Sequence, residues 1–137
     1  MNFEFLGDNF KEVDAKQMNS LTLAFIGDSV FEIIVRSHII KTNMNTKVKD
    51  AHKKAINYVK ATSQCEFMKK IEDKLDDDEM GVYKRGRNCK SISAPKSANI
   101  TQYRVATGFE ALIGYLYLVG KNERIGELMK YVFEGEI

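Results

Sequence analysis

The sequence has few of the residues that interrupt helices or cross-link small folds. Its 137 residues include one proline, two cysteines and no tryptophan. A single proline leaves long stretches free to form helices. The two cysteines, Cys65 and Cys89, form no C-x-x-C pair, and with His38 and His52 they lack the spacing of zinc ligands. We therefore expect reduced thiols, no disulfide framework and no zinc site.

Long apolar runs are also missing. No uncharged stretch approaches the roughly 20 residues that a membrane-spanning helix requires. The opening MNFEFLGDNFKEVDAK carries early acids and no basic-then-apolar pattern, so we expect no signal peptide. With 44% hydrophobic and 29% charged residues, the composition is that of a soluble globular protein. The sequence predicts one domain over residues 1–137, located in the cytoplasm and without a membrane partner.

Acidic residues are absent from one long segment. The net charge is only +2, yet no acid occurs between Glu79 and Glu110. The basic residues of this segment are Lys84, Arg85, Arg87, Lys90, Lys96 and Arg104. Such a bias predicts a local basic patch that contacts a polyanion. The alternative is a solvated loop with no binding role.

Apolar residues recur at helical spacing along most of the chain, and no segment alternates with a period of two. This pattern predicts an all-helical bundle with one real loop, over residues 88–99, which contains the proline. Residues 1–17 are expected to form a loosely packed opening segment anchored by apolar side chains. The expected helices cover residues 21–40, 48–61, 63–75, 76–86, 101–119 and 123–135, and the expected anchors are Phe3, Phe5, Leu6 and Phe10.

Short polar residues and glycine predict where these helices begin and end. Asn19 or Ser20 can cap the first long helix, because a side-chain oxygen accepts hydrogen bonds from free amides of the first turn. A capping box is expected at Ser63–Glu66. We also expect Thr46 and Asn122 to act as N-caps and Gly120 to close the second long helix.

Charged residues lie within the apolar helix of residues 21–40. Asp28, Glu32 and Arg36 follow one another at four-residue spacing, on one stripe. An ionised carboxylate in apolar surroundings is costly unless it is paired or binds a cation. One interpretation is a structural ladder, in which Arg36 pairs with Glu32 and Asp28 is a satisfied polar residue. The other is that Asp28 is a metal ligand or a catalytic acid.

A second acid, Glu110, lies in the equally apolar stretch FEALIGYLYL. Its neighbours on the same helix face are small: Ala106, Thr107 and Gly114. Small residues let two helices approach closely or leave space for an ion and its waters. Mg²⁺ often takes one or two protein carboxylates together with water and substrate phosphate, an arrangement suited to phosphodiester hydrolysis. The alternative is that Glu110 pairs with Arg104 or a lysine.

Three separated motifs, in this order, resemble the ribonuclease III family. LAFIGDSVFE resembles the signature helix of the ribonuclease III catalytic domain, and FEALIGYLYL resembles its last catalytic helix. KRGRN followed by KS, with TQYRVATGFEALIGYLYL close behind, is similar to the short Mini-ribonuclease III branch. The resemblance extends from about Ser20 to Val119.

The resemblance implies an all-α, ribonuclease III endonuclease-like helical domain that forms a homodimer. It implies Mg²⁺-dependent cleavage of double-stranded RNA, with Mn²⁺ able to substitute. Its branch lacks a separate double-stranded-RNA-binding domain and trims paired termini of precursor large-subunit (23S) ribosomal RNA. A ribosomal protein on the pre-ribosome is a further candidate partner.

The family's signature aspartate falls on Asp28 and its final catalytic glutamate on Glu110, so the resemblance implies that both are catalytic and bind the metal. Two further family acids are replaced here by Ala24 and Thr107, which implies fewer protein ligands for the metal. This replacement motivates an alternative: a catalytically inert protein that binds double-stranded RNA or acts in ribosome assembly.

The family's dimer places an aromatic side chain in a cavity of the partner, and Phe25 holds that position. Without the resemblance, Phe25 reads as a core phenylalanine.

The resemblance also implies that the loop before the final catalytic helix, here about residues 87–99, contacts RNA. Duplex RNA is recognised mainly through phosphates and 2′-hydroxyls, which suits basic and small polar side chains. Glu32 and Arg36 are expected to be structural, and His38 is expected to pack. The expected RNA-binding residues are Lys84, Arg85, Arg87, Asn88, Lys90 and Lys96.

Overall fold

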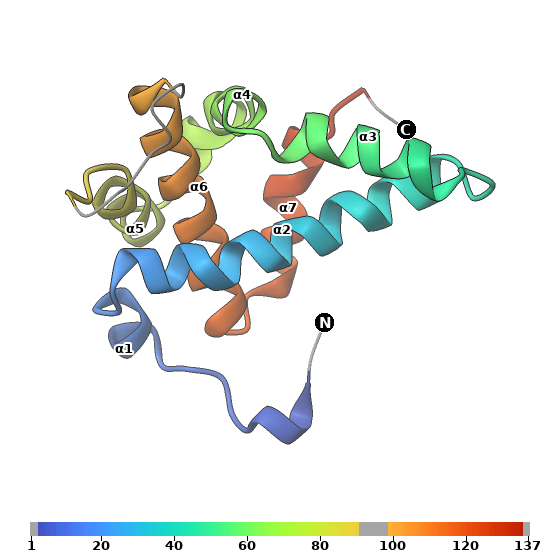
Figure 1. Ribbon diagram of the computed structural model, residues 1–137. Helices are drawn as coiled ribbons and strands as arrows, with labels where there is room; N and C mark the ends of the chain where they lie inside the picture. Colours follow the sequence, from blue (N-terminus) through green and yellow to red (C-terminus); the bar gives the residue numbers. More distant parts are fainter. Residues whose placement is uncertain (1–2, 91–98, 136–137) are drawn as a thin grey trace.

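The computed structural model describes residues 3–90 and 99–135, and within these ranges all regular structure is helical (Figure 1). The predicted all-helical fold is therefore confirmed. In chain order the elements are η1 (Glu4–Leu6), α1 (Glu12–Lys16), α2 (Ser20–Thr42), α3 (Val48–Val59), α4 (Ala61–Ile71), η2 (Glu72–Lys74), α5 (Asp77–Arg87), α6 (Ile100–Leu118) and α7 (Asn122–Val132). No helix in the described part of the chain is long and apolar enough to cross a membrane.

Helix α6 forms the centre of the bundle. Helices α2, α4, α5 and α7 all pack against it, and α2 crosses it in Figure 1. From residue 106 to residue 116 every side chain of α6 is buried except Glu110, which is half-buried. A helix that is apolar on all sides must be surrounded by other helices. The near-uniform hydrophobicity of this stretch therefore explains its central position.

Two glycines allow α2 and α6 to touch backbone to backbone. A Cβ atom placed on Gly27 would lie 1.7 Å from the carbonyl oxygen of Glu110. A Cβ atom on Gly114 would lie 2.0 Å from the carbonyl oxygen of Leu23. No other residue fits at these positions without moving a helix. The crossing therefore fixes Asp28, the residue after Gly27, next to Glu110.

Aromatic side chains fill the core beside this crossing. Phe31 of α2 lies edge-on to Phe109 of α6, with ring centroids 5.1 Å apart. Farther along α2, the His38 ring stacks on Phe133 at a centroid distance of 4.2 Å. The packing role expected for His38 agrees with this contact.

Helix α2 and helix α3 are less buried than their sequences suggest. On α2, Phe25 and Ile33 are 78% and 48% exposed. Among the apolar residues of α3, Ala55 is buried but Val48 and Ile56 are 72% and 62% exposed. These side chains remain exposed because the helices that pack on α2 (α6, α3 and α5) and on α3 (α2 and α4) do not cover them.

The cap predictions had mixed outcomes. The side chain of Asn19 accepts hydrogen bonds from the backbone amides of Leu21 (2.8 Å) and Thr22 (3.4 Å), so Asn19 is the cap of α2 as predicted. Gly120 ends α6 with a φ of +79°, a left-handed conformation that glycine adopts easily, also as predicted.

Three cap predictions are wrong. Helix α4 begins at Ala61, so Ser63 lies within it, and its hydroxyl donates to the carbonyl of Asn57 and forms no capping box. The N-caps of α3 and α7 are Lys47 and Lys121, one residue away from Thr46 and Asn122, and neither helix has a side-chain cap. Local sequence patterns identified the helices more reliably than the residues at which they begin.

The capping box of this fold lies at the start of α5. Asp76 accepts a hydrogen bond from the Glu79 amide (2.8 Å), and the Glu79 side chain accepts one from the Asp76 amide (2.9 Å). Glu79 is 1% exposed and pairs with Arg124, whose Nε and Nη2 lie 2.8 and 2.9 Å from its two oxygens. This buried ion pair ties α5 to α7. The pKa of Glu79 is lowered: burial acts against its charge, but the hydrogen bonds and charge of Arg124 outweigh the burial.

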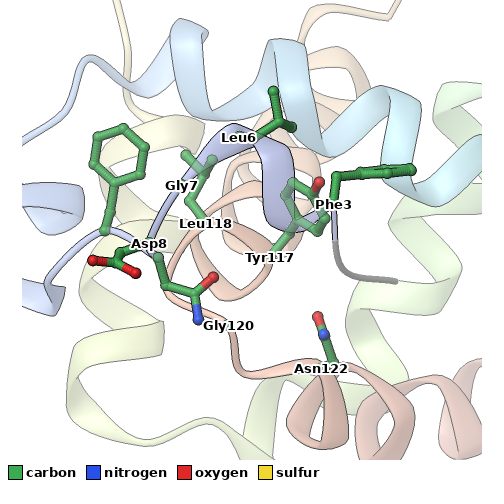
Figure 2. Close-up of a pocket in the computed structure, with 10 residues that line it drawn as sticks. Phe3, Leu6, Gly7, Asp8, Tyr117, Leu118, Gly120 and Asn122 are labelled. Atoms are coloured by element: carbon green, nitrogen blue, oxygen red, sulfur yellow. The ribbon is translucent and has the colours of Figure 1, made fainter.

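The opening segment is held mainly by its backbone. Phe3, Phe5, Leu6 and Phe10 are each at least 45% exposed, so the segment is loosely packed as predicted but these side chains do not anchor it. The amide of Phe10 donates to the carbonyl of Leu118, and Glu12 pairs with Lys121. Figure 2 shows the cavity between this segment and the end of α6; its lining includes Phe3, Leu6, Tyr117, Leu118 and Asn122.

Candidate active site

Asp28 and Glu110 meet where α2 crosses α6. The Asp28 side chain is exposed and Glu110 is half-buried. Burial, a hydrogen bond between the two carboxyl groups and the negative charge of Asp28 together raise the pKa of Glu110 from 4.5 to about 8. Two carboxyl groups this close do not both ionise readily unless a cation lies between them. The metal-free site therefore holds a proton at neutral pH.

A third polar side chain, Gln64 of α4, completes the buried side of this pair. Gln64 is 2% exposed. Its Nε2 donates to the carbonyl of Val59 at 2.9 Å and approaches Oε2 of Glu110 at 3.5 Å. The hydrogen bond from Gln64 opposes the rise in the Glu110 pKa, because it favours the ionised carboxylate.

The ion pair predicted on α2, between Glu32 and Arg36, is present. Arg36 Nε lies 3.3 Å from Glu32 Oε2, which confirms the pairing predicted for these two residues. Arg104 is exposed, and the structure records no ion pair to Glu110 within residues 3–90 and 99–135. Pairing of Glu110 with Arg104, or with a lysine of the described residues, is therefore wrong.

The donor set fits a hard divalent cation held by few protein ligands. Ala24 is 92% buried and offers no oxygen, and the hydroxyl of Thr107 donates to the carbonyl of Tyr103 at 3.0 Å. Among the described residues, no cluster of three or more acidic, histidine or cysteine side chains could hold a metal. Two carboxylates completed by water and substrate phosphates are an arrangement common for Mg²⁺. Asp28 and Glu110 would be the ligands.

The basic residues lie at the end of α5 and just after it. Lys84, Arg85 and Lys90 are exposed. The Arg87 guanidinium lies 5.5 Å from the centroid of the Tyr83 ring, and its Nε donates to the Asn88 side chain at 3.2 Å. Lys96, also expected to contact RNA, lies outside the described residues. Helix α5 packs on α6 at Gly86 and Gly108, two residues before Glu110.

Phe25 lies on the exposed surface of α2, three residues before Asp28. With 78% of its surface exposed, it is not a core phenylalanine, so that alternative is wrong. Packing within one chain does not explain why a phenylalanine at this position of α2 is exposed to water.

Sequence reasoning missed Gln64. Residues 63–66 read as a capping box, whereas Gln64 falls on the same stripe as Phe67, Met68 and Ile71, at spacings of three, four and seven residues. A polar residue at a core position of an otherwise apolar stripe is the signal that could have identified it. Sequence reasoning also missed Arg124, whose partner Glu79 is 45 positions away.

Comparisons with known proteins identify the family. Residues 21–121 match the family model for the Ribonuclease III domain. The chain is 52% identical to the Mini-ribonuclease 3 of Clostridium tetani over 93% of its own length and 85% of that protein. It is 44% identical to the Mini-ribonuclease 3 of Thermoanaerobacter sp., over 82% of its length and 79% of the relative.

The fold agrees with this similarity. An X-ray crystal structure of a Fusobacterium nucleatum protein superposes with a TM-score of 0.78 at 32% identity, covering 86% of this chain and 90% of the other. Residues 21–121, which match the family model, include both Asp28 and Glu110. The chain belongs to the ribonuclease III family, in its Mini-ribonuclease 3 branch, and the prediction of an endoribonuclease is confirmed.

Proposed function

We propose that this protein cleaves double-stranded RNA by Mg²⁺-dependent hydrolysis and matures the paired termini of precursor 23S ribosomal RNA. One observation carries the proposal: in a chain of this family, Gly27 brings the backbones of α2 and α6 into contact, which places Asp28 beside a half-buried Glu110 whose pKa it helps to raise. An isolated pair of like charges in this setting is unfavourable, and a cation between them removes the conflict.

The two side chains have different positions and therefore different roles. Asp28 is exposed and can face an incoming phosphate, whereas Glu110 is half-buried and closes the inner side of the site. When bound, Mg²⁺ supplies positive charge at the scissile phosphate and lowers the pKa of water. Glu110 must release its proton before it can bind the ion, so cation affinity increases as the pH approaches about 8.

The active unit that we propose is a homodimer of single-domain chains of residues 1–137, with Phe25 at its interface. The exposure of Phe25 supports this proposal, because a partner surface would remove a large apolar side chain from water. Two copies would provide two carboxylate pairs, one for each RNA strand. A ribosomal protein on the pre-ribosome is a further proposed partner.

Basic and polar groups beside the site are proposed to bind RNA phosphates and 2′-hydroxyls. The exposure of the α5 terminus and the absence of acids from the segment that follows support this role. Most of these residues lie at the end of α5 or just after it. The proposed contacts are Lys84, Arg85, Arg87, Asn88, Lys90 and Lys96.

The test is cleavage of a long RNA duplex by Asp28→Asn and Glu110→Gln in Mg²⁺ and in EDTA. Both substitutions keep the side-chain shape and remove the charge, so each should lower the cleavage rate by at least about 100-fold without unfolding the protein. Glu32→Gln is the matched control, because Glu32 lies one turn from Asp28 but pairs with Arg36.

Cleavage at the wild-type rate by either variant would contradict the two-carboxylate mechanism. Binding of duplex RNA without cleavage by the wild-type protein in Mg²⁺ would instead favour an inert RNA-binding protein. Single-stranded RNA of the same sequence completes the experiment, because it should not be cleaved.

A further inference from the structure

Gln64 occupies a position where an apolar residue would be expected. It lies on the buried stripe of α4 with Phe67, Met68 and Ile71, and only 2% of its surface is exposed. Its Oε1 atom is buried and has no hydrogen-bond partner among the described residues. A buried acceptor without a donor destabilises a fold. Core packing alone therefore does not account for an amide at this position.

The donor end of the amide explains its presence. The carbonyl of Val59 can only accept, so the nitrogen of the amide must face it, at 2.9 Å. The NH₂ group has a second hydrogen, and the same Nε2 atom lies 3.5 Å from Oε2 of Glu110. The contact with Val59 thereby fixes which end of the amide faces the carboxylate.

The neighbours of Gln64 hold it rigidly in place. Val59 ends α3 and Gln64 lies in the first turns of α4, so the amide connects the α3–α4 junction to α6. Gly27 places the backbone of α2 against the backbone of Glu110. The Glu110 backbone is thus fixed against α2, and its carboxylate lies within reach of the Gln64 amide.

We propose that Gln64 is a positioning residue that holds the Glu110 carboxylate in the orientation in which it can share a divalent cation with Asp28. This inference rests on the proposed function. A glutamate side chain has several rotatable bonds, and near Asp28 its carboxylate is repelled toward other orientations. The N–H of Gln64 attracts one carboxylate oxygen to the buried side and leaves the other free for the ion. Residues that orient metal ligands in this way commonly change metal affinity by about 10- to 100-fold when they are replaced.

The variant that tests this role is Gln64→Met, which keeps the length of the side chain and removes the N–H donors. The matched control is Ser63→Ala. Ser63 is the preceding residue, and its hydroxyl donates to the carbonyl of Asn57, also in α3, whereas no hydrogen bond to Glu110 is recorded for it among the described residues. Gln64→Leu is the second variant if Gln64→Met does not fold.

Three measurements are made on each protein: thermal unfolding, Mn²⁺ binding to the metal-free protein by electron paramagnetic resonance, and the Mg²⁺ dependence of duplex cleavage. For Gln64→Met we expect an unchanged Tm, Mn²⁺ affinity weaker by about tenfold or more, and a Mg²⁺ half-saturation raised by a similar factor. Excess Mg²⁺ should restore most of kcat, and the KM for RNA should stay the same. Ser63→Ala should match the wild type in metal binding.

Two results would overturn the proposal. One is Mn²⁺ affinity in Gln64→Met equal to that of the wild type. The other is a lowered Tm with cleavage reduced equally at all Mg²⁺ concentrations, because a purely structural role predicts that pattern. Mn²⁺ binding does not depend on RNA cleavage, so a wild-type protein that binds Mn²⁺ but cleaves no duplex would refute the proposed function and still test the role of Gln64.

Discussion

Replacing Gly27 with alanine tests whether the α2–α6 crossing creates the site. The added Cβ atom would lie 1.7 Å from the carbonyl oxygen of Glu110 and 2.9 Å from the amide nitrogen of Gly114. Cβ atoms essentially never approach other heavy atoms closer than 3.0 Å. Helix α2 must therefore move away from α6 by at least 1.3 Å, the difference between 3.0 Å and 1.7 Å. The atoms that clash belong to helix backbones and cannot rotate aside.

The displacement should affect both stability and chemistry. Overpacking a core costs about 1–3 kcal/mol, and a rigid backbone contact places Gly27→Ala at or above the upper end of that range. Asp28 follows Gly27 directly, so the retreat also separates it from Glu110. A misplacement of about 1 Å can lower a rate by about 100-fold, and we expect a loss of this size in the molecules that remain folded.

The assay combines urea unfolding with duplex cleavage at a temperature where the variant is folded. Gly126→Ala is the control: Gly126 lies in α7, and a Cβ atom there meets nothing within 4 Å. This control should stabilise the protein by about 0.5–1 kcal/mol, because alanine is the better helix former. Wild-type unfolding and cleavage in Gly27→Ala would refute the reasoning.

Three further perturbations follow from the same contacts. In metal-free protein the Glu110 pKa of about 8 exceeds its ordinary value of 4.5, so the folded state holds a proton that the unfolded chain releases. The contribution of Glu110 to the free energy of unfolding is complete below about pH 4.5 and is lost as the pH rises toward about 8, by at most about 5 kcal/mol, as measured by denaturant unfolding with EDTA. Glu110→Gln should lack this pH dependence, and a wild-type profile identical to that of Glu110→Gln would contradict the assignment. Arg124→Ala leaves the Glu79 carboxylate buried without its partner and should cost about 3 kcal/mol or more in the same assay, with no loss if the pair is only superficial. Phe25→Asp should convert a dimer to a monomer in light scattering, because a buried charge costs several kcal/mol; an unchanged dimer would place the interface elsewhere.

The sequence identified the helices that matter because their signals are local. Asn19 begins α2 and Gly120 ends α6 through contacts within a few residues, and both were predicted. The acids Asp28 and Glu110 stood out because a charged residue inside an apolar helix is unusual. The motifs around them were sufficient to indicate the family.

Contacts between distant segments could not be predicted in this way. The pair formed by Glu79 and Arg124 joins residues 45 positions apart, and no periodic pattern links them. Gln64 was not singled out, because residues 63–66 fit the pattern of a capping box formed by Ser63 and Glu66, whereas Gln64 lies on the buried stripe of α4. Only the position of α4 against α6 decides between these two interpretations.

For this protein, the sequence by itself determined which longer segments are helical, which two acids are exceptional and which family they indicate. These properties depend on composition, period and short-range hydrogen bonds. The tertiary structure decided that Gly27 brings the two acids together, that Gln64 faces Glu110, and that Phe25 remains exposed on one chain. The physical reason is that helix packing sets distances and burial between residues far apart in the chain, and these in turn determine charge, pKa and metal affinity.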